Sequence, residues 1–366
     1  MTVRAADLGV RPVINASATL TRLGGSLMPP PVLEAMRAGA ESFVDVVELQ
    51  RRVGERIAEL TGNEAGYVSC GAAAGMAVAI AGCIAGRDVE AIRRLPHVDG
   101  HEVVVFRAQR NGYDQAARQT GARLVELAVG CRREDLEAAL SSRTACVLYF
   151  AGAHFSSGAL PLEDVISVAH AHAVPVLVDA AAQIPPIANL WWYTRDVGAD
   201  AAIFSGGKGL RGPQSSGLVL GRQSIVESCI ANGPPNHSLG RPMKVGKEEM
   251  LGLLAAVEWS LQQDEAALLA SYEATVDGWL AGLSGIGGVR VERGYPSEAG
   301  QPHSRAVVRF EPDCQWTRSE VVAALWDGNP RIAVGEVDAD AIALNPQTLQ
   351  PGEDAIVLEA LRRLLL

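Results

Sequence analysis

The chain has 366 residues, of which 48% are hydrophobic, and this length and composition predict a large core divided between two lobes. A formal net charge of −10 with 5% aromatic residues excludes a broad nucleic-acid-binding surface, which needs clustered Lys and Arg. The N-terminus has no apolar stretch of the signal-peptide kind, and no run reaches the roughly 18 to 20 apolar residues of a membrane span. We therefore expect a cytoplasmic protein with small-molecule partners, no nucleic acid and no membrane.

Six cysteines are scattered without CxxC pairs or neighbouring histidines. This spacing predicts neither a zinc site nor a disulfide framework. We expect buried free thiols and no metal.

Short apolar runs alternate with amphipathic segments between residues 60 and 220. The low-charge run from Cys70 to Gly86 predicts a buried helix. The alternation predicts an α/β fold, a parallel sheet with helices on both faces. Predicted strands are Val103–Phe106, Ala145–Phe150, Val174–Val178 and Ala201–Phe204, and predicted helices are Asn111–Thr120, Arg133–Leu140 and Leu162–His172.

The C-terminal third predicts a smaller α+β lobe. Apolar residues at helical spacing over 247–283 predict one long helix that bridges the lobes, and residues 294–302 resemble a surface loop. We place the large domain, with its N-terminal segment, at residues 1–255 and the small domain at residues 256–366. Later predicted elements are a strand at Val307–Phe310, a helix at Arg318–Trp326, a strand pair around residues 337–340 and a helix at Asp354–Leu365.

Two residues follow predicted strands at the edge where ligands of such sheets bind. Asp179 closes an apolar run, where it serves either as a ligand group or as an N-cap for the residues that follow. Lys208 stands among glycines in the stretch Ser205–Pro213. A lysine whose pKa is lowered forms a Schiff base with a carbonyl cofactor, and we expect the glycines to let a planar ring approach the backbone. The alternative is an ordinary lysine in a glycine-rich turn.

A third feature lies at Gly71, Ala72 and Ala73, where small residues lead from an apolar run into the predicted helix. The free N–H groups and the positive dipole end of such a helix hold a phosphate. A tightly packed Ala/Gly helix is the alternative. A phosphate cradle, an acid at a strand end and a lysine together match the needs of pyridoxal 5′-phosphate.

The sequence resembles the fold-type I pyridoxal-phosphate enzymes, in the branch of selenocysteine synthase and D-glucosaminate-6-phosphate ammonia-lyases. The likeness is carried by Ile14–Gly25, Glu59–Gly75, Val174–Pro186, Ser205–Gly221 and Gly240–Trp259. It implies a mostly parallel seven-stranded sheet in the large domain. It also implies a homodimer or larger homo-oligomer.

The resemblance implies a role for each matching cofactor residue. Asp179 would pair with the pyridine nitrogen, and Lys208 would hold the cofactor and then shuttle the proton. Ser205 would donate to the phosphate beside residues 71–73. Arg241 would reach the phosphate or substrate of a neighbouring subunit, as Lys244 would. Gln183 would hydrogen-bond the phenolic oxygen of the ring, although it lies one residue further from the aspartate than in relatives.

Several further residues are candidates for the reacting groups. His154 stacks on the ring, acts on a leaving group, or is a structural histidine. Tyr113 and Arg110 follow another predicted strand, and Arg110 is otherwise a solvated side chain. Residues expected to bind anionic substrate groups are Arg22, Arg241, Lys244 and Arg331, with Tyr113 also placed at the substrate.

The predicted reaction begins with loss of the α-proton. The acidic charge and the start of the chain close to the Ile14–Gly25 segment argue against a tRNA substrate, and Asn345 stands where an arginine would anchor a transaminase substrate. We expect β-elimination with ammonia release from a hydroxylated amino acid or amino sugar acid. A racemase or epimerase, an aldolase, and a non-catalytic binding protein remain alternatives. A nicotinamide-dependent dehydrogenase is disfavoured, because no G-x-G-x-x-G follows the first strand.

Overall fold

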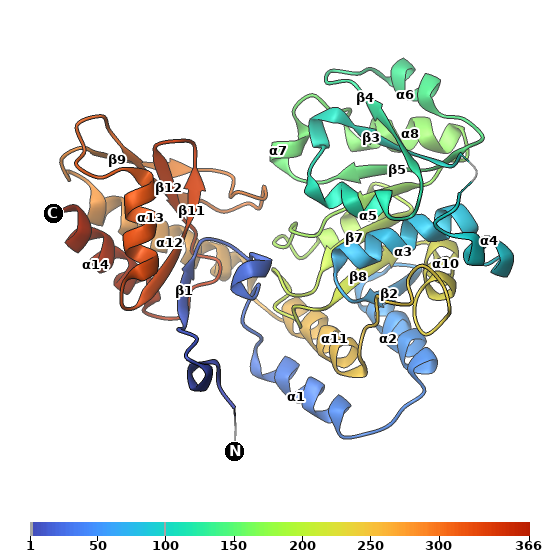
Figure 1. The fold of residues 1–366 in the computed structure, drawn as a ribbon, viewed down its shortest axis with the longest axis horizontal. Coiled ribbons are helices and arrows are strands. Elements are labelled where there is room, and N and C mark those ends of the chain that lie inside the picture. Colours follow the sequence, from blue (N-terminus) through green and yellow to red (C-terminus); the bar gives the residue numbers. More distant parts are fainter. Residues whose placement is uncertain (1–2, 99) are drawn as a thin grey trace. The chain divides into compact units, whose positions relative to one another are not determined.

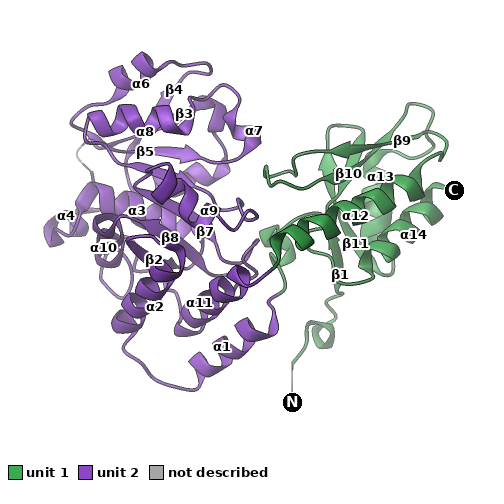
Figure 2. Cartoon of the chain, turned by 180° about the vertical axis from the view of Figure 1, so that it is seen from behind, with its two compact units in different colours: residues 1–27, 264–366 green, residues 28–263 purple. Residues whose placement is uncertain are grey.

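The computed structural model describes residues 3–98 and 100–366, which form two compact units (Figure 2). The large unit is residues 28–263. The small unit combines the described part of residues 1–27 with residues 264–366. Each unit has its own sheet and its own core.

The large unit is built on a seven-stranded sheet in the order β2-β8-β7-β6-β5-β3-β4 (Figure 1). Its strands run parallel except β8, which is antiparallel to both β2 and β7. The predicted mostly parallel sheet is confirmed. The strands are β2 (Ala65–Ser69), β3 (Glu102–Phe106), β4 (Arg123–Leu127), β5 (Thr144–Phe150), β6 (Val176–Asp179), β7 (Ala201–Ser205) and β8 (Gly217–Gly221).

The side chains of each strand point alternately to the two faces of this sheet, and they fill one core on each face. In β5, for example, Val147 and Tyr149 pack into one cluster while Cys146 and Leu148 pack into the other. Successive side chains of a strand point to opposite faces, so continuous apolar runs serve both cores. Helices α2, α6, α8 and α11 contribute to the first cluster and α3, α5 and α10 to the second. The helices of this unit are α1 (Pro30–Ala40), α2 (Val46–Thr61), α3 (Ala72–Ala85), α4 (Val89–Arg94), α5 (Gln115–Arg118), α6 (Arg133–Ala139), α7 (Ala153–Ser156), α8 (Leu162–Ala171), α9 (Asn189–Trp191), α10 (Gln223–Asn232) and α11 (Lys247–Leu261).

The small unit has a five-stranded sheet in the order β1-β11-β12-β10-β9. Only β1 and β11 pair in parallel, and the other pairs are antiparallel. Helix α12 packs on it through Val276, Trp279 and Leu283. The elements are β1 (Val13–Ala16), α12 (Glu265–Leu283), β9 (Val289–Gly294), β10 (Arg305–Phe310), α13 (Arg318–Asp327), β11 (Arg331–Val337), β12 (Ala341–Leu344) and α14 (Glu353–Leu365).

The N-terminal segment belongs to the small unit, which differs from the predicted division at residue 255. The reason is a strand pairing, in which Val13 lies opposite Arg331 and Ala16 opposite Val334. Helix α11 stays with the large unit, where it packs on α1 and α2. Sequence order alone gave no sign that residues 13–16 pair with a strand near the other end of the chain.

Two local predictions were wrong, and a third was right only in part. Residues 247–283 form two helices, because the Asp264 carboxylate accepts a hydrogen bond from the Ala267 N–H at 2.9 Å and starts α12 afresh. The predicted helix 111–120 is broken, because the Asn111 side chain accepts from the Tyr113 N–H at 2.8 Å and holds a 3₁₀ turn at 112–114. The predicted surface loop at 294–302 is irregular from residue 295 on and exposes Tyr295 by 64%, although it buries Ser297 and Gln301.

No helix within the described ranges is long and apolar enough to span a bilayer. The same residues contain no cluster of His, Cys, Asp and Glu suited to a metal ion. All six cysteines are free, with Cys146 and Cys229 buried and the others half-buried.

Replacing Asp264 by alanine tests the break between α11 and α12. We expect Asp264→Ala to lower the free energy of unfolding by about 1 kcal/mol, because the variant loses the cap of α12. Urea denaturation followed by circular dichroism measures it. An unchanged midpoint would contradict the assignment of Asp264 as the residue that starts this helix.

Candidate active site

Lys208 lies in the connection between the antiparallel strands β7 and β8. The Lys208 carbonyl accepts the Arg211 N–H at 3.0 Å, and the Gly206 carbonyl accepts the Gly212 N–H at 2.8 Å. The Gly206 N–H in turn donates to the Ser216 carbonyl at 2.9 Å. These bonds hold Lys208, which is half-buried, in a closed turn at the carboxyl end of β7.

The glycines beside Lys208 are required by packing between protein segments. A Cβ atom on Gly206 would lie 2.0 Å from the Ser216 Oγ, and one on Gly207 would lie 2.5 Å from the Gln214 Cα. A Cβ on Gly209 would lie 2.1 Å from the Ile184 carbonyl oxygen. Protein contacts therefore account for these three glycines, and the expectation that they admit a flat ring stays a prediction.

Asp179 is the last residue of β6, and its side chain is only 8% exposed. Its Oδ1 accepts the Ala181 N–H at 2.9 Å, and no helix starts there, since α9 begins at Asn189. The N-cap alternative is thus excluded within the described chain. Burial raises the pKa of the Asp179 carboxyl, and the Ala181 N–H and the Lys208 ammonium partly offset this rise.

The predicted phosphate cradle is the N-terminus of α3. Gly71 caps this helix with φ of 124°, and a Cβ there would meet nothing within 4 Å, so space is open in front of the first turn. The first N–H groups of a helix have no partner within the helix. The cradle thus combines open space with backbone donors, as a phosphate site requires.

Strand β8 brings the cradle beside the lysine turn. Gly217, its first residue, lies opposite Ser69 of β2 and opposite Ser205 of β7. A Cβ on Gly217 would lie 2.6 Å from the Ala72 nitrogen. Ser205 and the first turn of α3 are therefore neighbours, as predicted from the resemblance. The sequence analysis missed Gly217, whose only signal is a glycine opening an apolar run after two serines.

Tyr113 is the residue of its loop that approaches Lys208. The Lys208 Nζ lies 6.0 Å from the centre of the Tyr113 ring, which is 61% exposed. Arg110 instead forms ion pairs with Asp114 and Glu126. Of these two candidates, only Tyr113 is placed to meet a molecule held at Lys208.

The other predicted site residues have less defined surroundings. Gln183 is buried after β6, and its carbonyl accepts from the Asn189 side chain at 2.6 Å. His154 lies in α7, but its side chain falls outside the described part of the structure. Arg241 and Lys244 are exposed in the segment between α10 and α11. Their roles stay predictions.

Arg22 and Arg331 belong to the small unit. The Arg331 guanidinium stacks on the Trp326 ring at 4.6 Å, and its Nε donates to the Trp326 carbonyl at 2.9 Å. Asn345 is fully buried and donates to Glu298 at 2.7 Å. Arg22 is exposed, whereas Arg331 and Asn345 have structural contacts of their own.

Comparison with known proteins identifies relatives over the whole chain. The aminotransferase class-V family model matches residues 99–242. The D-glucosaminate-6-phosphate ammonia lyase of Salmonella typhimurium is 31% identical over 98% of this chain and 96% of its own length. A 5'-C-glycyluridine monooxygenase-decarboxylase of Streptomyces is also 31% identical, over 96% of this chain and 89% of its own length. An L-seryl-tRNA(Sec) selenium transferase of Nitratidesulfovibrio vulgaris is 25% identical over 97% of this chain and 82% of its own length.

The fold agrees with these sequence matches. A solved structure of D-glucosaminate-6-phosphate ammonia-lyase superposes with a TM-score of 0.84 at 31% identity, covering 100% of this chain and 99% of that one. The predicted resemblance and fold are therefore confirmed.

Two buried aspartates allow a test of the Asp179 environment. Burial raises the Asp179 pKa, so at pH values just above the ordinary 3.8 the folded apoprotein binds more protons than the unfolded chain. The contribution of Asp179 to the free energy of unfolding therefore falls as the pH rises from the ordinary pKa to the raised one. The variant Asp179→Asn has no carboxyl group to ionise at this position, so it avoids this loss of stability. We expect the variant to be more stable than the parent apoprotein at pH 7, with the difference shrinking toward pH 4.

Asp200 is the matched control, because its buried carboxylate accepts from His170, from the Val176 N–H and from Arg222 at 2.7–2.9 Å. Asp200→Asn should destabilise by about 2 kcal/mol, since hydrogen bonds to a charged group are lost. Urea unfolding of both apoproteins across pH measures the contrast. If both variants are less stable than the parent at pH 7, the inference that burial raises the pKa of Asp179 is contradicted.

A pair of glycine variants tests the packing of the lysine turn. Gly209→Ala should destabilise the large unit by about 1–3 kcal/mol, because the new methyl group meets the Ile184 carbonyl. Gly112→Ala is the control, since a Cβ there meets nothing within 4 Å. Thermal unfolding compares them, and equal midpoints would show that the turn has room for side chains.

Proposed function

We propose a lyase reaction for this chain, which belongs to the pyridoxal-phosphate-dependent family that contains D-glucosaminate-6-phosphate ammonia lyase. The proposed substrate is a hydroxylated amino acid or amino sugar acid. The proposed chemistry is removal of the α-proton, β-elimination and release of ammonia. The observation that supports it most is the grouping of Asp179, Lys208 and the α3 N-terminus at one edge of a sheet, in a chain that matches an ammonia lyase from end to end.

The residues fit pyridoxal phosphate. Asp179 is a buried carboxylate with no ion pair within 4.0 Å in the described chain, so a protonated ring nitrogen would complete its surroundings. The open first turn of α3 and Ser205 suit a phosphate, with Gly71, Ala72 and Ala73 supplying the backbone. Lys208 is near enough to Asp179 to affect its pKa. The bound cofactor supplies an electron sink for negative charge at the α-carbon.

Each of these residues contributes a defined physical effect. The Asp179 carboxylate would pair with the ring nitrogen and keep it protonated, and its burial strengthens that interaction by excluding water. The Lys208 amine takes the α-proton from the substrate, and its closed turn limits the directions from which it approaches. The Tyr113 hydroxyl or His154 would donate a proton to the departing β-hydroxyl, which leaves as water. Hydrolysis of the resulting C=N group then consumes one water molecule and frees ammonia and a 2-keto-3-deoxy acid.

The anionic end of the substrate needs a cationic partner. Lys244, Arg241, Arg22 and Arg331 are the cations that we propose for it. Since Arg331 is held on Trp326, the exposed Arg22, Arg241 and Lys244 have more freedom to serve. We also propose a cytoplasmic homodimer or larger homo-oligomer, in which Arg241 reaches the phosphate of the neighbouring subunit.

One comparison favours a second candidate function. The monooxygenase-decarboxylase relative has the same identity to this chain as the ammonia lyase. Oxygen-dependent decarboxylation at the same site is therefore the alternative with an observation behind it. The racemase or epimerase and aldolase alternatives rest on Tyr113 as a second acid close to Lys208.

A panel assay on the holoenzyme separates these reactions. D- and L-hydroxyamino acids and amino sugar acids, including D-glucosaminate and its 6-phosphate, are scored for ammonia, keto acid, carbon dioxide, oxygen uptake and optical rotation. The lyase predicts equal amounts of ammonia and keto acid without oxygen uptake. Carbon dioxide with oxygen uptake supports the second candidate, and stereoinversion alone would refute the lyase.

Lysine variants tie the activity to this site. Lys208→Arg keeps the charge but loses the nucleophilic amine, so we expect it and Lys208→Ala to lower kcat by about 10²- to 10⁴-fold or more. The control is Lys247→Arg, because Lys247 bonds to the Gly39 carbonyl and Glu248 and lies outside the proposed machinery. Retained turnover in both Lys208 variants would contradict the proposal.

A further inference from the structure

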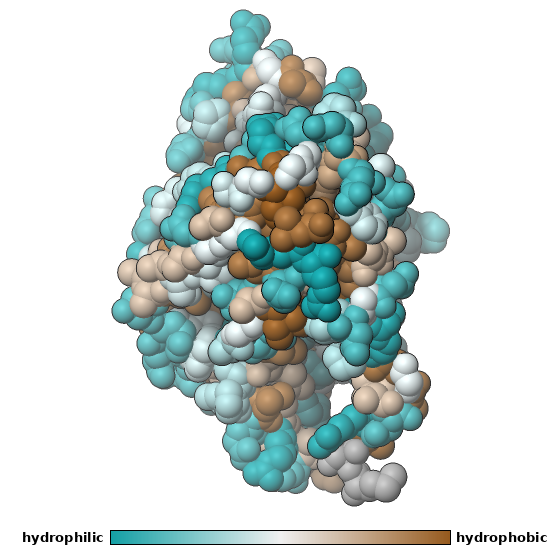
Figure 3. Space-filling view, turned by 90° about the vertical axis from the view of Figure 1, so that its left-hand side faces the viewer, coloured by the Kyte–Doolittle hydropathy of each residue, from teal (hydrophilic) through white to brown (hydrophobic). Residues whose placement is uncertain are grey.

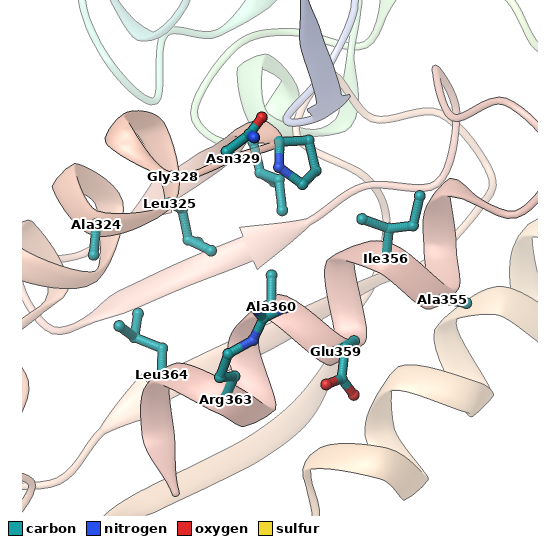
Figure 4. A pocket seen from close by; sticks show the side chains of 12 residues that line it. Ala324, Leu325, Gly328, Asn329, Ala355, Ile356, Glu359, Ala360, Arg363 and Leu364 are labelled. Atoms are coloured by element: carbon teal, nitrogen blue, oxygen red, sulfur yellow. The ribbon is translucent and has the colours of Figure 1, made fainter.

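An apolar groove of about 640 Å³ lies on the small unit between α13 and α14. Figure 4 shows side chains of both helices lining it. In Figure 3, brown hydrophobic atoms gather on the face where these helices lie, with hydrophilic atoms beside them. The apolar lining includes Leu325, Ile332, Ile356, Ala360 and Leu364.

The N-terminal arm, residues 3–10, begins beside this groove. Arg11 fixes its root by donating to the carbonyls of Asp327, at 3.4 Å, and Gly328, and Gly328 lines the groove. Beyond Arg11 the arm exposes Val10 by 56% and Leu8 by 76%. The arm therefore has apolar side chains without cover, next to an apolar groove without cover.

Charges on the arm and on the groove are complementary. The arm carries Arg4, the extended residue before the 3₁₀ turn Ala5–Leu8, and Asp7, whose carboxylate accepts the Arg4 backbone N–H at 2.8 Å. The groove rim carries Glu359 and Arg363, four residues apart on α14, both exposed and in no ion pair within the described chain. The arm and the rim thus each carry one cation and one anion, and the two signs come in opposite order along the chain.

The arm does not fill the groove of its own chain, since Leu8 is three-quarters exposed. We propose that the arm of a second copy of this chain lies in the groove, with Arg4 against Glu359, Asp7 against Arg363, and Leu8 beside Leu364. The arm of the first copy lies in the groove of the second in the same way, so both arms and both grooves are covered. A reciprocal contact of this kind closes a symmetric pair. The inference concerns assembly and stands apart from the proposed reaction.

Cross-linking between differently tagged copies tests the exchange. Leu8→Cys and Ala360→Cys are made as separate full-length variants, one carrying a larger tag, and are mixed and treated with a short bis-maleimide. We expect a covalent heterodimer on a denaturing gel. The parent chain, whose six cysteines are buried or half-buried, and the pair Leu8→Cys with the exposed Glu134→Cys are controls and should give several-fold less.

Charge reversal adds a check on the orientation. Asp7→Arg in the Leu8→Cys chain should lower the heterodimer yield several-fold, and Arg363→Asp in the Ala360→Cys chain should restore it. Circular dichroism confirms that each variant is folded. A mixture that gives no more heterodimer than the controls overturns the proposal, as does a double variant, Leu8→Cys with Ala360→Cys, that links only within one chain.

Discussion

The site depends on one close contact, between Gly217 at the start of β8 and the backbone at Gly71 and Ala72. Strand β8 runs between β2 and β7, so it joins the strand that leads into α3 with the strand that leads into the lysine turn. Any side chain at Gly217 would separate them, because its Cβ would lie 2.4 Å from the Gly71 carbonyl carbon. Backbone contact therefore sets the spacing between the phosphate cradle and the lysine.

The second constraint is the burial of Asp179 without a cationic partner in hydrogen-bonding contact. A buried, ionised carboxylate is costly to fold, and the Ala181 N–H and the nearby Lys208 offset only part of that cost. Asp200, which lies beside Val176 at the other end of β6, shows the contrast, since three donors surround its carboxylate. A fold that keeps Asp179 in this state gives up stability at this position, a trade expected where function opposes packing, as the proposed cofactor role of Asp179 requires.

The sequence predicted the strands of the large sheet better than it predicted the connections. Apolar runs such as Val103–Phe106 identify buried strands, because both faces of this sheet are covered. Asp179 ends β6 and Lys208 follows β7, as the sequence predicted, and their roles in the site stay predictions. The strand at Val13–Ala16 was missed because it pairs with β11, far away in sequence. The packing reason for the glycines around Lys208 was missed, because their neighbours, Gln214, Ser216 and Ile184, become apparent only in three dimensions.

The central claim is that Lys208 bonds covalently to pyridoxal phosphate. The most direct measurement is peptide mass spectrometry of the purified holoenzyme after borohydride reduction, which makes that bond permanent. The account predicts a pyridoxyl group on the peptide that contains Lys208, and none on the peptides that contain Lys244 or Lys247. A label on either of those lysines, or no label in a protein saturated with the cofactor, would contradict the account.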